Sequence, residues 1–246
     1  MSSGKNERLD HRVWVEGLAD TLDLARRLIM TGTVLVDDTP VTKPGTLIRP
    51  QARLRQKGKQ LPWVSRGGIK LAHAIDTWGL EVTARTCLDV GASTGGFTQV
   101  LLHHGAREVI AMDVGYGQLD WKLASDPRIR VMDRFNVRDL KSEDLPGGVD
   151  LIVVDVAFIA LTRVLPPLMT VLKTPGEGVL LIKPQFELPP QQIPTGGIVR
   201  EAMAHDQAIA TVRTHCLACG LKVSDVIPSP ITGSKGNQEF LLHCSR

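Results

Sequence analysis

The sequence of 246 residues contains no apolar run of the ~18 residues that a membrane span requires. Its first ten residues, MSSGKNERLD, are polar and lack the apolar segment of a secretory signal peptide. We therefore expect a cytoplasmic protein without a membrane span.

Cysteine is also scarce, with four residues in the whole chain. Only Cys216 and Cys219 form a CxxC pair, and a zinc ribbon needs a second pair. The pair lies late in a helical pattern, whereas a thioredoxin-like motif opens a helix. We expect no metal site and interpret Cys87, Cys216, Cys219 and Cys244 as small apolar side chains of the core.

Acidic residues are absent from positions 39–75, although the whole chain carries a net charge of only +3. Residues 1–60 hold 11 Lys and Arg against 7 Asp and Glu, while the remainder holds 18 against 19. A basic stretch of this kind is typical of proteins that contact phosphates, although it is also found on solvated surfaces. The acid-free stretch contributes the basic residues Lys43, Arg49, Arg53, Arg55, Lys57, Lys59, Arg66 and Lys70.

The first sixty residues predict a small α+β unit. Asp20 is a candidate helix cap, and Leu22, Ala25 and Ile29 fall on one helical face before Gly32 ends the helix. Short strands at 33–36 and 40–41 flank a turn at 37–38 and predict a hairpin. Residues 56–62 are polar and end in proline, which favours a linker.

From residue 84 the pattern alternates between strand and helix, which predicts an α/β fold with a parallel sheet covered on both faces. A last strand pair without an intervening helix predicts an antiparallel edge. The expected strands are 86–90, 109–113, 130–132, 151–155, 178–183, 222–227 and 238–243. The expected helices are 96–104, 158–172 and 200–219.

The loop after the first of these strands is rich in glycine and has the pattern DxGxxxGG, beginning at Asp89. A dinucleotide-binding loop would carry GxGxxG, which is missing. An acid at the strand end repels a pyrophosphate but suits an amino group and a sulfonium, so the loop favours S-adenosylmethionine over NAD. The candidate contacts in the loop are Asp89, Gly91, Ala92, Ser93, Gly95, Gly96 and Phe97. Asp113 could hold ribose hydroxyls, and Asp133 and Asn136 could lie near the adenine, although each also fits a turn.

Four charged residues stand where an apolar side chain would be ordinary. Asp155 and Lys183 end two strongly apolar strands, at the edge where open α/β sheets build active sites. Lys70 lies just after a Gly-Gly pair, and Glu239 lies at the start of the last expected strand. Each could be an ordinary edge charge. Buried charges, however, must be paired or neutralised, so two at adjacent strand ends favour a functional site.

These residues carry two family resemblances. The pattern Arg8-Leu9-Asp10, Gly17-Leu18-Ala19 and Gly32-Thr33-Val34 resembles the RNA-binding domain of ribosomal protein S4, with Asp37-Asp38 in place of the usual glycine turn. The set Lys70, Asp155, Lys183 and Glu239, with the neighbouring words SRGGIKL, DVGASTGGFT and LIKPQFE, resembles the haemolysin A (TlyA) family of rRNA 2′-O-methyltransferases. Ala157 and Ala160 depart from that family, where serine is usual.

The resemblance implies an S4-like RNA-binding domain at 1–59, a linker at 60–66 and a Rossmann-like class I methyltransferase domain at 67–246. It implies S-adenosylmethionine-dependent 2′-O-methylation of a cytidine in 16S or 23S rRNA, free or in ribosomal subunits. The tetrad residues would be catalytic. The expected RNA contacts are Arg8, Arg12, Arg26, Arg27, Lys43, Arg49, Arg53, Arg55, Lys57, Lys59 and Arg66.

The chemistry suits such a set, because a ribose hydroxyl must lose a proton before it attacks an activated methyl group. A lysine serves as a base only when its pKa falls from ~10.4, and burial or a second cation has that effect. We expect Lys183 to accept the proton and Lys70 to stabilise the developing oxyanion. Asp155 and Glu239 would orient the two lysines.

Three other functions remain open. A non-catalytic rRNA-binding or ribosome assembly protein would bind RNA without methyl transfer. A membrane-active haemolysin would need an apolar span or a basic amphipathic helix, and neither is found in the sequence. A methyltransferase acting on base amines would carry an Asn/Asp-Pro-Pro-aromatic motif, where this chain has Asp155-Val156-Ala157-Phe158.

Overall fold

The computed structural model describes residues 6–57 and 62–246 and divides the chain into two compact units, Met1–Leu61 and Pro62–Arg246. Lys59, one of the expected RNA contacts, lies outside the described residues. Part of the expected linker lies outside them too, so its bounds stay a prediction.

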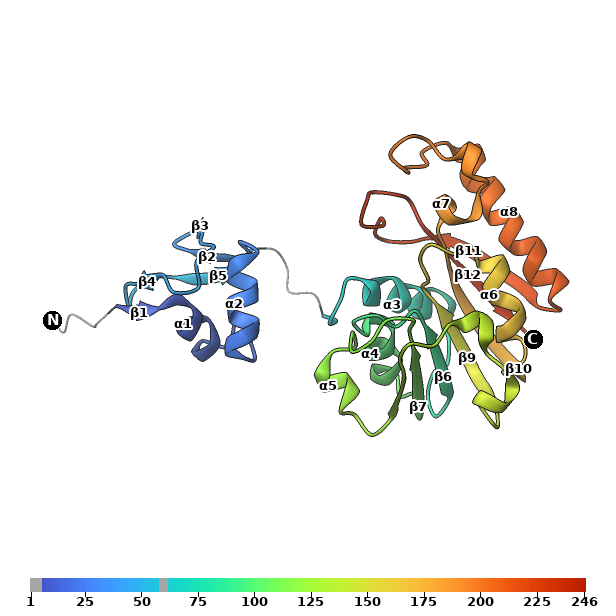
Figure 1. The fold of residues 1–246 in the computed structure, drawn as a ribbon, viewed down its shortest axis with the longest axis horizontal. Coiled ribbons are helices and arrows are strands. Elements are labelled where there is room, and N and C mark those ends of the chain that lie inside the picture. The colour runs from blue at the N-terminus through green and yellow to red at the C-terminus, as the bar shows by residue number, and fades with distance from the viewer. Residues whose placement is uncertain (1–5, 58–61) are drawn as a thin grey trace. The chain divides into compact units, whose positions relative to one another are not determined.

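Within residues 6–57 the N-terminal unit combines short helices with two small antiparallel sheets (Figure 1). One sheet pairs β1 with β4, and the other has the strand order β3-β2-β5. The elements are β1 (Glu7–Arg8), α1 (Leu9–Val15), α2 (Leu22–Met30), β2 (Val34–Val36), β3 (Thr39–Pro40), β4 (Leu47–Ile48) and β5 (Leu54–Gln56).

The core of this unit lies between the two helices and the sheet, as the apolar periodicity predicted. Leu9 and Val13 of α1 pack with Ala25 and Ile29 of α2 and with Val34, all fully buried. The hairpin is confirmed, since β2 pairs with β3 around Asp37 and Asp38, both at positive φ.

The prediction that Asp20 caps the second helix is wrong by one residue. Thr21 is the N-cap, and its side chain accepts a hydrogen bond from the Leu24 amide at 3.1 Å. Serine, threonine and aspartate all serve at this position, so the adjacent pair Asp20-Thr21 left the sequence ambiguous.

The C-terminal unit is built on one seven-stranded sheet with the order β11-β12-β10-β9-β6-β7-β8. The strands β10, β9, β6, β7 and β8 run parallel, while β12 is antiparallel to both β10 and β11. This confirms the predicted mostly parallel sheet with an antiparallel edge. The elements are α3 (Gly67–Trp78), β6 (Thr86–Val90), α4 (Gly96–His103), β7 (Glu108–Met112), α5 (Trp121–Ala124), β8 (Ile129–Met132), η1 (Val137–Asp139), η2 (Ser142–Asp144), β9 (Val149–Val154), α6 (Leu161–Leu168), β10 (Leu172–Ile182), α7 (Pro184–Glu187), η3 (Pro190–Gln192), α8 (Ala202–Ala218), β11 (Lys222–Pro228) and β12 (Phe240–Ser245).

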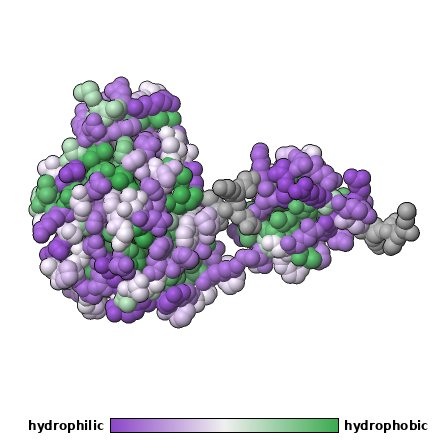
Figure 2. Space-filling model, turned by 180° about the vertical axis from the view of Figure 1, so that it is seen from behind, coloured by the Kyte–Doolittle hydropathy of each residue, from purple (hydrophilic) through white to green (hydrophobic). Residues whose placement is uncertain are grey.

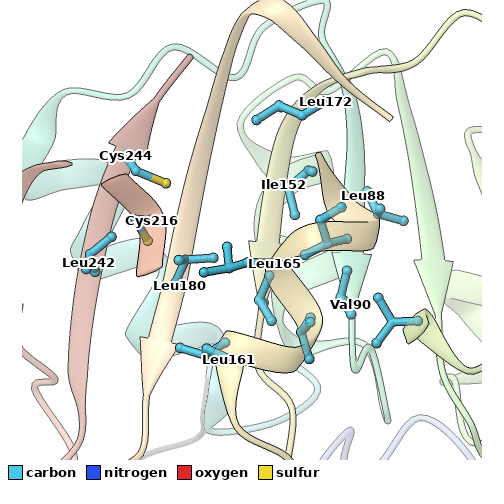
Figure 3. Packing of buried hydrophobic residues seen from close by; sticks show 14 of the residues in the cluster. Leu88, Val90, Ile152, Leu161, Leu165, Leu172, Leu180, Cys216, Leu242 and Cys244 are labelled. Atoms are coloured by element: carbon cyan, nitrogen blue, oxygen red, sulfur yellow. The ribbon is translucent and has the colours of Figure 1, made fainter. Parts of the chain in front are cut away.

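Alternate residues of the central strands enter two separate cores, because successive side chains of a strand point to opposite faces. Ile152 and Leu180 pack against α6 and α8, and Figure 3 shows them beside Leu165 and Cys216. Leu151 and Val153 of β9, with Val179 and Leu181 of β10, point to the opposite face and pack against α3 and α4. Helices therefore cover both faces of the sheet, and the polar groups that follow β6, β9 and β10 gather at one edge.

Several elements differ from the prediction. The expected helix 158–172 is shorter, since α6 spans Leu161–Leu168 and β10 already begins at Leu172. Phe158 is not helical, as its φ is 63° and 91% of its surface is exposed. Helix α3 was not predicted, because its Gly-Gly start suggested a flexible hinge.

The four cysteines are free thiols, and Cys87, Cys216 and Cys244 are buried as expected, whereas Cys219 is half-buried. Among residues 6–57 and 62–246 there is no cluster of three or more metal-ligating side chains. No helix in the same part of the chain has the length and apolarity to cross a membrane.

Candidate active site

The four charged residues singled out in the sequence lie together at the carboxyl edge of the sheet. Lys70 comes from the second turn of α3, Asp155 follows β9, Lys183 follows β10, and Glu239 precedes β12. Their charged atoms form one chain of alternating sign. Glu239 Oε2 lies 2.6 Å from Lys70 Nζ, which lies 3.7 Å from Asp155 Oδ2, and Asp155 Oδ1 lies 2.5 Å from Lys183 Nζ.

This chain of charges is largely removed from water. The side chains of Lys70 and Glu239 are 7% and 4% exposed, and those of Lys183 and Asp155 are 12% and 20% exposed. Two cations face two anions, so each buried charge has a partner of opposite sign. Asp155 contacts both lysines, whereas Glu239 contacts Lys70. The prediction that the acids orient the lysines therefore fits the geometry.

Close backbone packing brings Lys70 to the sheet edge. At Gly68 an added Cβ would collide with the ring of Trp63. At Gly96, the first residue of α4, an added Cβ would lie 2.9 Å from the Gly68 amide nitrogen. Gly96 therefore allows α4 to approach the start of α3, and Gly68 allows Trp63 to pack on α3. Gly68 is thus a packing requirement of this helix start.

The glycine-rich loop after β6 packs directly under Asp155. Gly91 has a φ of 84°, and an added Cβ would collide with the backbone oxygen of Asp155. Ser93 and Gly95 also have positive φ values, which folds the loop back over the start of α4. The Ser93 amide donates to Asp113 Oδ2 at 2.8 Å. The loop and the strand ends therefore form one connected surface.

Two cavities open on this surface. The larger, of about 970 Å³, is lined by Gly91, Ser93, Asp113 and Asn136 together with apolar residues such as Met112, Phe135 and Val156. The smaller, of about 260 Å³, is lined by all four members of the charged tetrad and by Ala92, Gly96 and Phe97. Gly91, Ser93 and Asp155 line both cavities, so the two spaces adjoin at Asp155.

Three expected cofactor contacts do not line either cavity. Asp89 is fully buried and accepts a hydrogen bond from Thr98 Oγ1 at 2.6 Å. Burial raises the pKa of Asp89 to about 7, against the opposing effect of the Thr98 hydrogen bond. Asp133 accepts from the Gly117 amide at 2.8 Å, and Gly95 is the N-cap of α4. These three residues stabilise the loops around the cavities, but their side chains do not line either cavity.

Several residues of the larger cavity were not identified from the sequence. Phe158 stands at its rim, with its ring 5.3 Å from that of Phe186. Glu187 accepts from the Leu161 amide at 2.9 Å and so joins the segment after β10 to the start of α6. Burial raises the pKa of Glu187 to about 7, which the Leu161 hydrogen bond opposes. The motif around Lys183 was visible in the sequence, but nothing in it indicated that the Glu187 side chain would accept a hydrogen bond from the start of α6.

The expected RNA contacts of the N-terminal unit are mostly exposed, and hydrophilic residues cover much of the visible face of this unit (Figure 2). Arg12 differs, because its side chain is 11% exposed and donates to the carbonyl oxygens of Arg49, Pro50 and Ala52. Its guanidinium therefore holds the loop before β5. The exposed members are Arg8, Arg26, Arg27, Lys43, Arg49, Arg53, Arg55 and Lys57.

Arg66 is exposed as well, but it lies in the C-terminal unit. Its Nη2 donates to the carbonyl oxygen of Thr232 at 2.7 Å, which ties the start of α3 to the loop between β11 and β12. That loop contributes Gly233 and Ser234 to the smaller cavity.

The chain is similar to known proteins over nearly its whole length. The chain is 40% identical over 239 residues to the 16S/23S rRNA (cytidine-2′-O)-methyltransferase TlyA of Mycobacterium tuberculosis, covering 97% of this chain and 89% of that protein. It is 37% identical to Hemolysin A of Brachyspira hyodysenteriae, covering 96% and 98%. The family model described as FtsJ-like methyltransferase matches residues 63–246, and the S4 domain model matches residues 7–54. The chain belongs to the FtsJ-like methyltransferase family.

Solved structures agree with this assignment. A hemolysin candidate from Streptococcus thermophilus shares 40% identity with this FtsJ-like methyltransferase, with a TM-score of 0.77 over 98% of this chain and 89% of the other. An S-adenosylmethionine-dependent methyltransferase from Mesorhizobium loti shares the fold at 16% identity, with a TM-score of 0.53 over 71% and 96% of the two chains. The predicted Rossmann-like methyltransferase fold, the S4-like domain and the resemblance to the TlyA family are all confirmed.

Proposed function

We propose that this chain transfers a methyl group from S-adenosylmethionine to the ribose 2′-oxygen of a cytidine in 16S or 23S ribosomal RNA. The observation that carries the proposal is the buried chain of charges formed by Lys70, Asp155, Lys183 and Glu239, which adjoins a cavity of about 970 Å³. The name of the Mycobacterium tuberculosis relative supports the nucleotide and the RNA. Such a substrate places the reaction in the cytoplasm.

The residues of the larger cavity fit S-adenosylmethionine. A volume of about 970 Å³ lies within the range of small-molecule sites. Apolar side chains such as Met112 and Phe135 suit an adenine ring, and Asn136 offers an amide at its edge. Both carboxylate oxygens of Asp113 accept backbone amides, from Ser93 and Gly115, and each keeps a lone pair for a ribose hydroxyl. The cofactor would supply a methyl group already activated on sulfonium.

The smaller cavity supplies the acid–base chemistry. Lys183 must first release a proton to solvent, and the neutral amine then accepts the proton of the 2′-hydroxyl at Nζ. Asp155 Oδ1, 2.5 Å away, stabilises the ammonium that forms. Lys70 keeps its positive charge between Glu239 and Asp155 and stabilises the developing oxyanion. The bound sulfonium would supply the methyl group to the deprotonated oxygen, and Lys183 holds the proton until solvent removes it.

The S4 domain supports RNA as the substrate, because it adds a basic surface to the catalytic unit. Its exposed basic residues are arginines and lysines, which suit contacts to phosphates, and phosphate contacts position an RNA without specifying sequence. We therefore assign positioning to the N-terminal unit and nucleotide selection to the catalytic unit.

Methyl transfer to rRNA from cells that lack the gene tests the proposal. The full chain is incubated with these RNAs and tritiated S-adenosylmethionine, and the labelled fragments are mapped by mass spectrometry. We expect label on a cytidine ribose with wild type and none with Lys183→Ala. RNA binding without any label would instead show a non-catalytic RNA-binding protein, and label on a base would show a base methyltransferase.

A further inference from the structure

One buried amide in the C-terminal unit joins two loops that are far apart in the sequence. Asn237 is 2% exposed and lies in the loop between β11 and β12, two residues before Glu239. Its Oδ1 accepts a hydrogen bond from the Val199 amide at 2.8 Å, and its Nδ2 donates to the carbonyl oxygen of Gly197 at 2.9 Å. The side chain therefore pairs with residues 197–199 as the peptide group of a neighbouring strand would, and its donor and acceptor are both used.

The backbone of the same residue closes a turn that packs on the tetrad. The carbonyl oxygen of Asn237 accepts from the Gly233 amide at 2.8 Å, and that of Gly233 accepts from the Gly236 amide at 2.9 Å. An added Cβ at Gly233 would lie 2.6 Å from Glu239 Oε1. Gly233 and Glu239 both line the smaller cavity. Residues 233–237 therefore form a turn that contacts the carboxylate and supplies part of the cavity wall.

The Glu239 carboxylate is held between this turn and Lys70. Its Oε2 lies 2.6 Å from Lys70 Nζ, while its Oε1 faces Gly233. Its backbone oxygen accepts from the Ser229 amide at 2.8 Å, which closes the base of the loop. A displacement of the turn would thus change how Glu239 meets Lys70.

We propose that Asn237 is a positioning residue for methyl transfer, because it holds the 233–237 turn against Glu239 and so fixes the Lys70 end of the chain of charges. That the reaction is methyl transfer rests on the proposed function. Asn237 lines neither cavity, so it acts through Gly233 and Glu239. Asparagine suits this role because its planar amide offers a donor and an acceptor together, whereas aspartate offers acceptors alone.

The competing interpretation is that Asn237 only stabilises the two loops. That role predicts a lower melting temperature, with unchanged kinetics at temperatures where the variant is folded. A positioning role predicts a lower kcat in the folded variant, because a misplacement of about 1 Å among reacting groups can lower a rate by about 100-fold.

The test measures methyl transfer by the full chain to rRNA from cells that lack the gene, well below the melting temperature. Asn237→Ala removes both side-chain bonds. Asn237→Asp keeps the shape and the acceptor for the Val199 amide, but it turns a carboxylate oxygen toward the Gly197 carbonyl. We expect kcat to fall about tenfold to 100-fold in both variants, with a smaller change in KM for RNA. Kd for S-adenosylmethionine, measured by calorimetry, should stay unchanged, because the larger cavity is not touched.

Two further variants separate positioning from stability. Gly233→Ala keeps both side-chain bonds of Asn237 and presses a methyl group against Glu239, so it should also lower kcat. Thr86 is 6% exposed at the amino end of β6, where its Oγ1 accepts from Arg107 Nη2 at 2.7 Å. Thr86→Val removes that bond and should lower the melting temperature with kcat unchanged. Gly233→Ala and Asn237→Asp decide the question if Asn237→Ala does not fold.

Hydrogen exchange followed by mass spectrometry gives a readout that does not depend on catalysis. Asn237→Ala should speed exchange in the peptides that cover 197–199 and 233–239 together, and Thr86→Val should not. Folded Asn237 variants with the kcat of wild type overturn the positioning role, even when both peptides exchange faster. Wild type that methylates no rRNA overturns the proposed function instead. Faster exchange in both peptides would then still support the link between the two loops, and unchanged exchange would overturn it.

Discussion

Removing one partner of the buried Lys70–Glu239 pair should destabilise the catalytic unit far more than removing both. At 2.6 Å and an effective dielectric of about 20, their gross attraction is about 6 kcal/mol. Desolvation of two ions costs several kcal/mol each, so the intact pair contributes little net stability. Lys70→Met keeps the cost for Glu239, which is 4% exposed, and removes the attraction. We expect a loss of about 3–5 kcal/mol in the free energy of unfolding at pH 7.

Urea unfolding of the full chain at pH 7, followed by circular dichroism, measures this difference. The double variant Lys70→Met/Glu239→Leu removes both charges and should recover most of the stability at pH 7, while it transfers no methyl group. A single variant as stable as wild type at pH 7 would refute the reasoning. So would a double variant that is no more stable than the single one.

Three further predictions concern the sheet edge. Lys183→Ala should lower methyl transfer to rRNA at least about 100-fold while Kd for RNA stays unchanged, and a rate near wild type would exclude this lysine as the base. Burial raises the pKa of Glu187 from 4.5 to about 7. The folded state therefore tolerates this carboxyl group fully below pH 4.5, where it is protonated, and the free energy of unfolding falls as the pH rises through 7 and the buried group becomes charged. Glu187→Gln keeps an acceptor for the Leu161 amide, and thermal unfolding should show it more stable than wild type by about 2–3 kcal/mol at pH 8 but by little at pH 4.5. An equal difference at both pH values would contradict that cause. Gly91→Ala forces a Cβ against the carbonyl of Asp155 at a φ of 84°, so calorimetry should show a loss of about 1–3 kcal/mol, and an unchanged melting temperature would contradict the close contact.

The sequence predicted the sheet edge well, because buried parallel strands have an unambiguous pattern. Continuous apolar runs ended at Asp155 and Lys183, and the rule that parallel strands end at one edge placed these two side chains together. Lys70 and Glu239 were singled out by their positions beside a Gly-Gly pair and at the last strand, and the family resemblance, not periodicity, joined them to the other two. Their ion pair at 2.6 Å forms because α3 packs beside the residue that precedes β12, and no local sequence pattern encodes that tertiary contact.

Helix α3 and Phe158 were misread for opposite physical reasons. A Gly-Gly start lowers helix propensity, yet here the absence of Cβ atoms allows contact with Trp63 and with α4. Phe158 belongs to a residue type that rarely adopts positive φ, so propensity favoured a helix. Its left-handed backbone directs the chain from Asp155 toward α6, and tertiary contacts decide that turn.

Charge counting also overlooked how the arginines of the N-terminal unit are used. The stretch without acids seemed to offer free cations, but Arg49 and Arg55 pair with Asp37 and Asp38 of the hairpin turn. Arg12 turns inward to three carbonyl oxygens. A linear count cannot distinguish these uses, because the partners lie outside the stretch or on the backbone.

Asp155 is the residue through which the two cavities communicate. It lines both, pairs with both lysines, and lends its backbone oxygen to the contact that excludes any side chain at Gly91. A methyl donor in the larger cavity and a hydroxyl in the smaller one would therefore be positioned against the same side chain. The end of β9 would then align the two reactants. A shift of the glycine-rich loop would move Asp155 away from the two lysines and would change the lining of the larger cavity at the same time.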